Sequence, residues 1–146
     1  MNLVNPVKYV NLANPVKILP MQTDQLTHKI INAAYTVHNS LGAGFLENVY
    51  HNAMLIELRQ MGLEVDSQYP INVYYKDCLV GEYYADLFVE RQVIVELKAV
   101  ENLHPAHEVQ LVNYLQGTGT DIGLLINFAT SVEVKRKYRV YKKKDD

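Results

Sequence analysis

The sequence predicts a mixed α/β fold, of the α+β kind, in which helices flank a mixed β-sheet. Apolar residues recur at helical spacing early in the chain, and short β-rich runs follow them. A helix-like stretch, "HPAHEVQLVNYLQG", then separates the apolar runs "QVIVELKAV" and "DIGLLINFA". Because a helical crossover joins strands that run in the same direction, we expect these two runs to pair in parallel.

Two helices are expected to open the folded part. Thr23 is a suitable N-cap for the first helix, and Gly42 or Gly44 can end it. The second helix is predicted to run from near Phe45 to Met61, followed by Gly62.

Strand signals dominate the next part of the chain. "EVDSQYPINVYYK" is β-rich, and Pro70 indicates a break or an edge strand. "CLVGEYYADLFVE" and "QVIVELKAV" form a predicted hairpin with its turn at residues 90–92. The third helix has Pro105 in its first turn and Gly117 at its end. "DIGLLINFA" is typical of a strand buried on both faces, and residues 132–142 fit a final strand, with a helix as the alternative.

Composition indicates a single soluble domain in a reducing compartment. The chain has 146 residues, 49% hydrophobic and 21% charged, without an apolar run long enough for a membrane span or a secretory signal. Cys78 is the single cysteine, so no internal disulfide forms and a cytoplasmic location is expected. The five histidines and Cys78 show no paired spacing of zinc ligands.

The chain is expected to have three parts. Residues 1–20 contain the near-duplicates "NLVNPVKYV" and "NLANPVKIL", which are too few for a solenoid and are interpreted as an extended or disordered leader. Residues 21–142 form the predicted folded domain, and residues 143–146 form a charged tail.

Three charged residues interrupt the predicted hairpin. If its turn is centred on Arg91, Asp86 lies directly opposite Glu96, and side-chain alternation puts Lys98 on the same face. The other face is uniformly apolar and is predicted to carry Ala85, Leu87, Val89, Val93, Val95, Leu97 and Ala99.

Two facing carboxylates repel each other unless a cation lies between them. Oxygen ligands of this kind suit Mg²⁺ or Mn²⁺, so Asp86 and Glu96 are predicted to hold such an ion. The alternative is a solvent-facing strand whose Lys98–Glu96 ion pair has no function.

These residues resemble a known family. Asp86 together with "ELK" at residues 96–98 is similar to the core motif of the PD-(D/E)XK nucleases, although Ala85 stands where the superfamily name has proline. "GFLENVY" at residues 44–50 resembles the G-x-x-E-x-x-Y pattern of the GxxExxY proteins. The resemblance extends over roughly residues 24–138 and implies a restriction-endonuclease-like αβββαβ core.

The resemblance also implies roles for individual residues. Asp86 and Glu96 would be metal ligands, with the backbone carbonyl of Leu97 as a further one. Lys98 would activate water or stabilise charge on the phosphate. Glu47 corresponds to the acidic helix residue that completes the site in many of these nucleases, and it is a further candidate ligand.

The third helix and Tyr50 are expected to support the site. Gln110 and Tyr114 resemble the Q-x-x-x-Y motif of the exonuclease-like branch, and their spacing puts them on one helix face with His107. A bracing role in the wall of the site is the alternative for Gln110 and Tyr114. Tyr50 is expected to be core or hydrogen-bonded scaffold.

A basic run near the C-terminus offers contacts to phosphates. Residues 135–144 carry seven of the fourteen Lys and Arg residues, although the formal net charge of the chain is −2. We take Lys135, Arg136, Lys137 and Arg139 as candidate nucleic-acid contacts, with a solvated terminal strand as the alternative.

The function predicted from the sequence is Mg²⁺-dependent or Mn²⁺-dependent hydrolysis of phosphodiester bonds in DNA, with RNA as a second substrate class. One alternative is a non-catalytic module on the same fold that binds nucleic acid or protein. Another is an interaction protein that works through residues 1–20. Because the domain is small, we expect a homodimer or a protein partner to help it grip a substrate.

Overall fold

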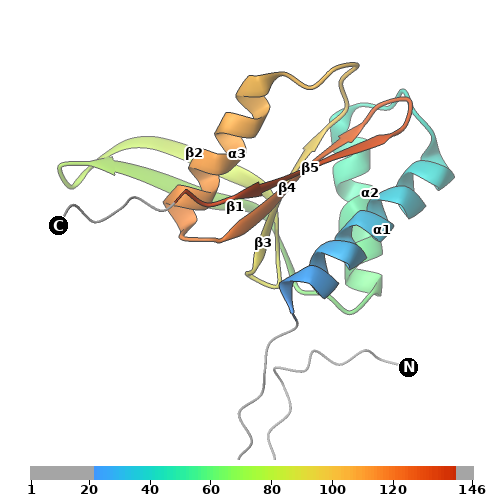
Figure 1. Cartoon of the computed structure of the whole chain (residues 1–146), viewed down its shortest axis with the longest axis horizontal. Coiled ribbons are helices and arrows are strands. Elements are labelled where there is room, and N and C mark those ends of the chain that lie inside the picture. The colour runs from blue at the N-terminus through green and yellow to red at the C-terminus, as the bar shows by residue number, and fades with distance from the viewer. Residues whose placement is uncertain (1–21, 141–146) are drawn as a thin grey trace, which may run out of the picture.

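The structure is a computed structural model, and it describes residues 22–140. The predicted leader and the charged tail of residues 143–146 lie outside the described residues. Figure 1 shows the elements, which in chain order are α1 (Thr23–Leu41), α2 (Glu47–Gln60), β1 (Val65–Tyr75), β2 (Cys78–Val89), β3 (Val93–Lys98), α3 (Pro105–Thr118), β4 (Ile122–Phe128) and β5 (Val132–Tyr138).

The strands form one five-stranded sheet in the order β1-β2-β3-β4-β5. All neighbours are antiparallel except β3 and β4, which are parallel as the helical crossover predicts. Because β1 is an edge strand, Pro70 costs no ladder bond on its open side. The last stretch is a strand and not the alternative helix. The predicted mixed sheet flanked by helices is confirmed.

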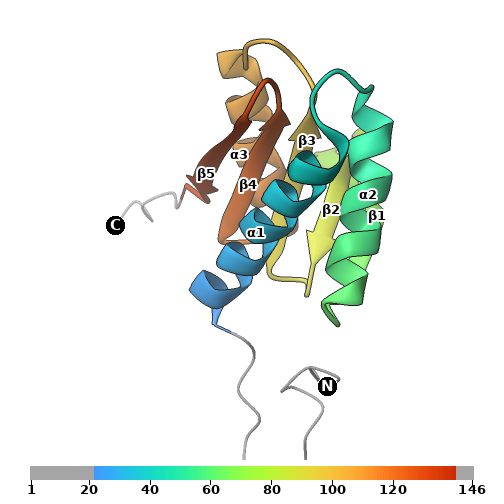
Figure 2. The same ribbon diagram turned by 90° about the vertical axis from the view of Figure 1, so that its right-hand side faces the viewer.

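The sheet lies between two helical layers. Figure 2 shows α1 and α2 on one face and α3 on the other. The apolar side chains of α1 and α2 pack with one set of strand residues, and those of α3 pack with a second set that includes Phe88 and Ile94. With helices on both sides, β4 is buried along its whole length, as predicted. Within residues 22–140, no helix is both long and apolar enough to cross a membrane.

Turn geometry sets the register of the β2–β3 hairpin. Its connection has three residues, 90–92, of which Glu90 and Arg91 have positive φ, 52° and 49°, and the amide of Gln92 donates to the carbonyl of Val89 at 3.0 Å. The ladder then pairs Val89 with Val93 and continues to the pair Leu87–Val95. The predicted register is therefore confirmed.

Helix boundaries differ from the predictions at three places. Thr23 is the first residue of α1 and not its cap, because the extended residue before it is Gln22, which makes no side-chain capping bond. The second helix begins at Glu47, two residues later than Phe45. The third helix ends at Gly119, whose φ of 66° is left-handed, and Gly117 lies inside it.

One side chain of the hairpin lies in the layer opposite to the predicted one. Ala85 was predicted on the same face as Leu87, but Leu87 packs in the cluster under α1 and α2 and Ala85 packs in the cluster under α3. The alternation breaks at the step between these two residues. On the neighbouring strand, Gln68 falls between the residues paired with Ala85 and Leu87, and it has a φ of 54°. At this irregular step the side chains of both strands change the face of the sheet on which they lie.

Candidate active site

The ladder between β2 and β3 is continued by side chains at the point where Asp86 faces Glu96. The amide nitrogen of Asp86 donates to Oε1 of Glu96 at 3.0 Å. The amide nitrogen of Leu97 donates to Oδ2 of Asp86 at 2.8 Å. Each carboxylate therefore satisfies a backbone amide of the opposite strand, and this exchange holds the two acids side by side.

Burial makes this acidic pair electrostatically costly. Glu96 is only 5% exposed, whereas Asp86 and Lys98 are half-buried. Desolvation, followed by the negative charge of Asp86, raises the pKa of Glu96 from 4.5 to about 8, although Lys98 opposes the shift. The structure therefore holds a proton, or an added cation, more readily at Glu96 than an exposed glutamate would.

Glu47 approaches the pair from the other side of the sheet. It is the first residue of α2, where an acid is favoured by the helix dipole. Desolvation raises the pKa of Glu47; Lys98 and His51 oppose this shift and Asp86 adds to it. The residue is exposed on the protein surface. Glu47 thus shares one electrostatic environment with Asp86 and Lys98.

A cavity of about 460 Å³ connects Glu47 with Asp86. It is open to solvent at α2 and reaches the irregular step of β1. Within it, Nε2 of the buried His51 lies 2.9 Å from Oγ of Ser67. The residues that line it are Glu47, Asn48, His51, Asn52, Ser67, Gln68 and Asp86.

Tyr50 positions the start of α2. Its hydroxyl donates to the carbonyl oxygen of Gly42 at 2.6 Å and accepts from the amide of Phe45 at 3.3 Å. Its ring is fully buried and stacks on Phe128, with the centroids 4.5 Å apart. Gly44, in the same loop, has a φ of 104° that side chains rarely tolerate. The G-x-x-E-x-x-Y residues thus shape the loop that presents Glu47.

The third helix covers the opposite side of the acidic pair. Burial, followed by the charges of Glu96 and Asp86, raises the pKa of Tyr114 to about 12, while a hydrogen bond with Gln110 opposes the shift. Burial and the nearby Lys98 lower the pKa of His107. These residues therefore approach the site from α3, as their spacing predicts.

The start of this helix is held by histidines. Nδ1 of His104 accepts from the amide of Ala106 at 3.0 Å, and Nδ1 of His107 accepts from the amide of His104 at 3.2 Å. This reciprocal capping box satisfies amides that the first helical turn leaves open. It secures the helix end that lies nearest to Lys98.

The acidic pair has the chemistry for a hard divalent cation that keeps part of its water shell. Each carboxylate commits one oxygen to a backbone amide and has a second oxygen available as a ligand. Within residues 22–140, no three His, Cys, Asp or Glu side chains gather closely enough to hold a metal ion by themselves. Mg²⁺ commonly binds through one or two carboxylates and fills its other positions with water and phosphate oxygens.

The predicted phosphate contacts of β5 are largely engaged in ion pairs. Lys135 is exposed and lies on the α3 side of the sheet, whereas Arg136 faces α1 and donates to Oγ1 of Thr27 at 3.0 Å. Because the strand alternates, the basic residues do not form one surface. The ion pairs are Arg136 with Asp24 at 3.7 Å, Lys137 with Glu108 at 2.7 Å and Arg139 with Asp121 at 2.8 Å.

Asn127 supports the site and was missed by the sequence reasoning. It is fully buried on β4, where its Oδ1 accepts from the amide of Val100 and its Nδ2 donates to the carbonyl of Val100, both at 2.9 Å. This pair of bonds fixes the chain two residues after Lys98. The available signal was the single amide side chain in "IGLLINFA", the otherwise apolar part of that run after Asp121.

Comparisons with known proteins identify the superfamily and the fold of the chain. The profile of the PD-(D/E)XK nuclease superfamily matches residues 24–139. Among solved structures, the chain is similar to the one titled "Crystal structure of SSO0001", with a TM-score of 0.53 and 13% identity. The match covers 66% of this chain and 52% of that one, so the chain spans about half the length of its structural relative. The likeness concerns the fold, which is restriction-endonuclease-like. No curated protein matches.

Proposed function

Because the chain belongs to the PD-(D/E)XK nuclease superfamily, we propose that it hydrolyses phosphodiester bonds of DNA with Mg²⁺ or Mn²⁺ as its cofactor. The observation that carries the proposal is the pair of hydrogen-bonded carboxylates, Asp86 and Glu96, with Lys98 beside them. A buried pair of like charges destabilises a fold unless a cation offsets it. Such a pair is therefore better explained by a cation site than by stability.

The carboxylates of Asp86 and Glu96 would hold the ion, with the backbone carbonyl of Leu97 and the Glu47 carboxylate as further ligands. When bound, the ion would polarise the scissile phosphate, lower the pKa of a water molecule and offset charge on the leaving oxygen. Lys98 would orient the attacking water or pair with negative charge that develops on the phosphate. Glu47 would hold the same water through a hydrogen bond.

The supporting residues keep this arrangement in place. The Tyr50 hydroxyl holds the loop before Glu47, and Asn127 holds the chain after Lys98. Gln110 and Tyr114 wall the site from α3. We assign positioning roles to Tyr50, to Asn127 and to the pair Gln110 and Tyr114, since the contacts described above show each of them bonded to the scaffold around the site.

The loop before α2 supports a narrower family assignment. We propose that the chain is a GxxExxY protein. The loop before α2 has a positive φ at position 44 that favours glycine, and the hydroxyl of Tyr50 holds the same loop through the carbonyl of Gly42.

The cellular setting is also proposed. A single exposed cysteine, Cys78, fits a reducing cytoplasm. RNA is the second substrate class, and a homodimer or a protein partner would extend the short surface that this domain offers to a duplex.

A cleavage assay tests the proposal. Supercoiled and single-stranded circular DNA are incubated with the purified chain and Mg²⁺ or Mn²⁺, and the products are followed by gel electrophoresis. We expect cleavage by the parent and none by Asp86→Asn or Glu96→Gln. Amide variants are used because their oxygens still accept the hydrogen bonds of the opposite strand. Glu82→Gln, at an exposed carboxylate on the same strand β2, is the matched control.

Calorimetric titration of Mn²⁺ separates the outcomes. Saturable binding that disappears in Asp86→Asn assigns the ion to the hairpin. Undiminished cleavage by Asp86→Asn or Glu96→Gln would refute the site. A parent that neither binds the ion nor cuts any substrate would leave the chain as a non-catalytic binding module.

A further inference from the structure

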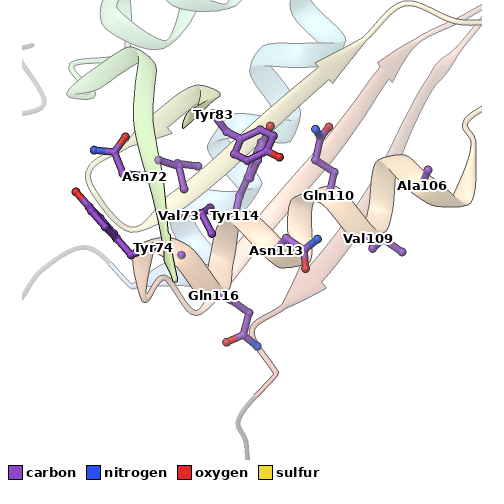
Figure 3. A pocket seen from close by; sticks show the side chains of 12 residues that line it. Asn72, Val73, Tyr74, Tyr83, Ala106, Val109, Gln110, Asn113, Tyr114 and Gln116 are labelled. Atoms are coloured by element: carbon purple, nitrogen blue, oxygen red, sulfur yellow. The ribbon is translucent and has the colours of Figure 1, made fainter. Parts of the chain in front are cut away.

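A groove of about 980 Å³ lies between the outer part of the β1–β2 hairpin and α3. Figure 3 shows the side chains that line it, with Tyr83 and Tyr114 between the hairpin and the helix and Tyr74 at the outer edge of the hairpin. Its volume is at the upper end of the roughly 300–1,000 Å³ typical of ligand pockets. None of the twelve side chains that line it carries a formal charge.

The aromatic rings in the groove are accessible to a ligand. Tyr74 is 61% exposed and Tyr83 is 46% exposed, although both come from strands whose inner ends are buried. Tyr114, only 7% exposed, backs Tyr83 with its ring centroid 5.9 Å away at a tilt of 48°. Tyr83 is thus backed by Tyr114 and partly open to solvent, as an aromatic ring that stacks on a base has to be.

Side-chain amides complement these rings. Asn72 comes from the hairpin, and Gln110, Asn113 and Gln116 come from α3. An amide offers one acceptor and two donor hydrogens, and Asn and Gln pair in this way with the edges of nucleic-acid bases. The groove therefore combines aromatic rings that can stack on the faces of bases with amides that can hydrogen-bond to their edges. Its lining has no charged side chain that could pair with a charged group of a ligand.

The groove lies next to the candidate active site. Tyr114, which lines the groove, packs in one cluster with Ala85, the residue before Asp86, and with Ile94, two residues before Glu96 on β3. Gln110 lines the groove as well and hydrogen-bonds with Tyr114. A polymer held at the acidic pair can therefore extend into the groove along α3.

We propose that this groove binds unpaired bases of a single-stranded stretch next to the phosphodiester at Asp86 and Glu96. The inference rests on the proposed function, because it names the form of nucleic acid that this site receives. Because the lining of the groove is uncharged, we expect the bases to lie inside the groove and the charged phosphates to lie at its rim, in contact with solvent. Gln116, which lines the groove, donates to the carbonyl of Val140.

The test is fluorescence anisotropy with the full chain and labelled oligonucleotides in EDTA, so that binding is measured without cleavage. The probes are oligothymidylate of about twelve nucleotides, a duplex of the same length, and a strand with the same phosphates but no bases. We expect oligothymidylate to bind at least about fivefold more tightly than the base-free strand, which is the contribution of one weakly stacked base. It should also bind more tightly than the duplex.

Variants connect this difference to the groove. Tyr83→Ala and Tyr74→Ala are each expected to weaken oligothymidylate binding about fivefold or more, whereas Tyr83→Phe keeps the ring and the affinity. Tyr84→Ala is the matched control, because Tyr84 is an equally exposed neighbour, 55% exposed, that does not line the groove. Circular dichroism of each variant verifies that the hairpin folds.

The result that overturns the inference is equal affinity for the normal and base-free strands, or equal effects of Tyr83→Ala and Tyr84→Ala. Tighter binding of the duplex would overturn it too. The proposed function fails separately, by an absence of cleavage with Mg²⁺ or Mn²⁺. Cleavage without groove-dependent binding would reject only the groove, and groove-dependent binding without cleavage would reject only the nuclease.

Discussion

The amide of Asp86 donates to the side chain of Glu96 at 3.0 Å, and the Asp86 side chain accepts the amide next to Glu96 at 2.8 Å. The carboxyl groups of Asp86 and Glu96 thus accept the amide hydrogens that backbone carbonyls would accept if the pairing of β2 and β3 continued past Leu87 and Val95. Their backbone bonds hold them together against their repulsion. The arrangement favours any cation that reaches the remaining carboxylate oxygens.

The raised pKa of Glu96 predicts how stability depends on pH. The folded protein binds this proton more tightly than the unfolded chain, so metal-free stability should fall as pH rises from about 4.5 to about 8. The loss attributable to Glu96 is on the order of a few kcal/mol. Urea unfolding in EDTA at pH 5 and pH 8 measures it.

Glu96→Gln isolates that contribution. The variant should lose much less stability than the parent between the two pH values, whereas Glu82→Gln should follow the parent. Identical pH dependence in parent and Glu96→Gln would contradict the assigned protonation.

Lys98→Ala should separate ion binding from catalysis. We expect cleavage to fall on the order of 10²–10³-fold, because a positioned positive charge beside the phosphate is lost. Calorimetry should show Mn²⁺ binding that is unchanged or tighter, since a cation next to the carboxylates has been removed. Weaker Mn²⁺ binding would instead mean that Lys98 organises the ligands.

Tyr50→Phe tests the loop before α2. The ring should still stack on Phe128, but the carbonyl of Gly42 loses its 2.6 Å partner, so we expect a loss of roughly 1–3 kcal/mol in unfolding free energy. Cleavage should fall as well, because Glu47 follows the released loop. Tyr35→Phe, at a tyrosine exposed on α1, serves as control and should change neither quantity.

Asn127→Leu tests the anchor after β3. It removes both hydrogen bonds to Val100 and leaves a backbone amide and carbonyl without these partners, at an expected cost of about 2–4 kcal/mol. Chemical denaturation measures the cost. A cleavage defect that persists at low temperature, where the variant is folded, would show that Val100 positions Lys98.

Rules that depend only on neighbouring residues were enough to predict the β2–β3 hairpin and the face on which its charged residues lie. Alternation and a tight turn at Arg91 correctly predicted that Asp86 faces Glu96, because both depend on neighbouring residues of the chain. The same kind of rule predicted the buried β4 and the crossover helix, since a strand that is apolar on both faces except for Asn127 has to be covered on both sides. The edge position of Pro70 follows from its missing amide hydrogen.

Tertiary contacts decided the features that depend on distant segments. Alternation alone placed Ala85 with Leu87, but the irregular step opposite Gln68 moves it to the other layer. Charge alone made Lys135, Arg136, Lys137 and Arg139 candidate phosphate contacts, and this stays a prediction; only the fold shows that acids from α1, α3 and the loop before β4 pair with three of them. The Asn127 anchor and the tyrosine groove likewise join elements far apart in sequence. The side chains of a residue and of its neighbours in sequence determine whether the segment is a helix or a strand and which of its faces is apolar. Which distant residues it contacts depends on how the helical layers pack on the sheet.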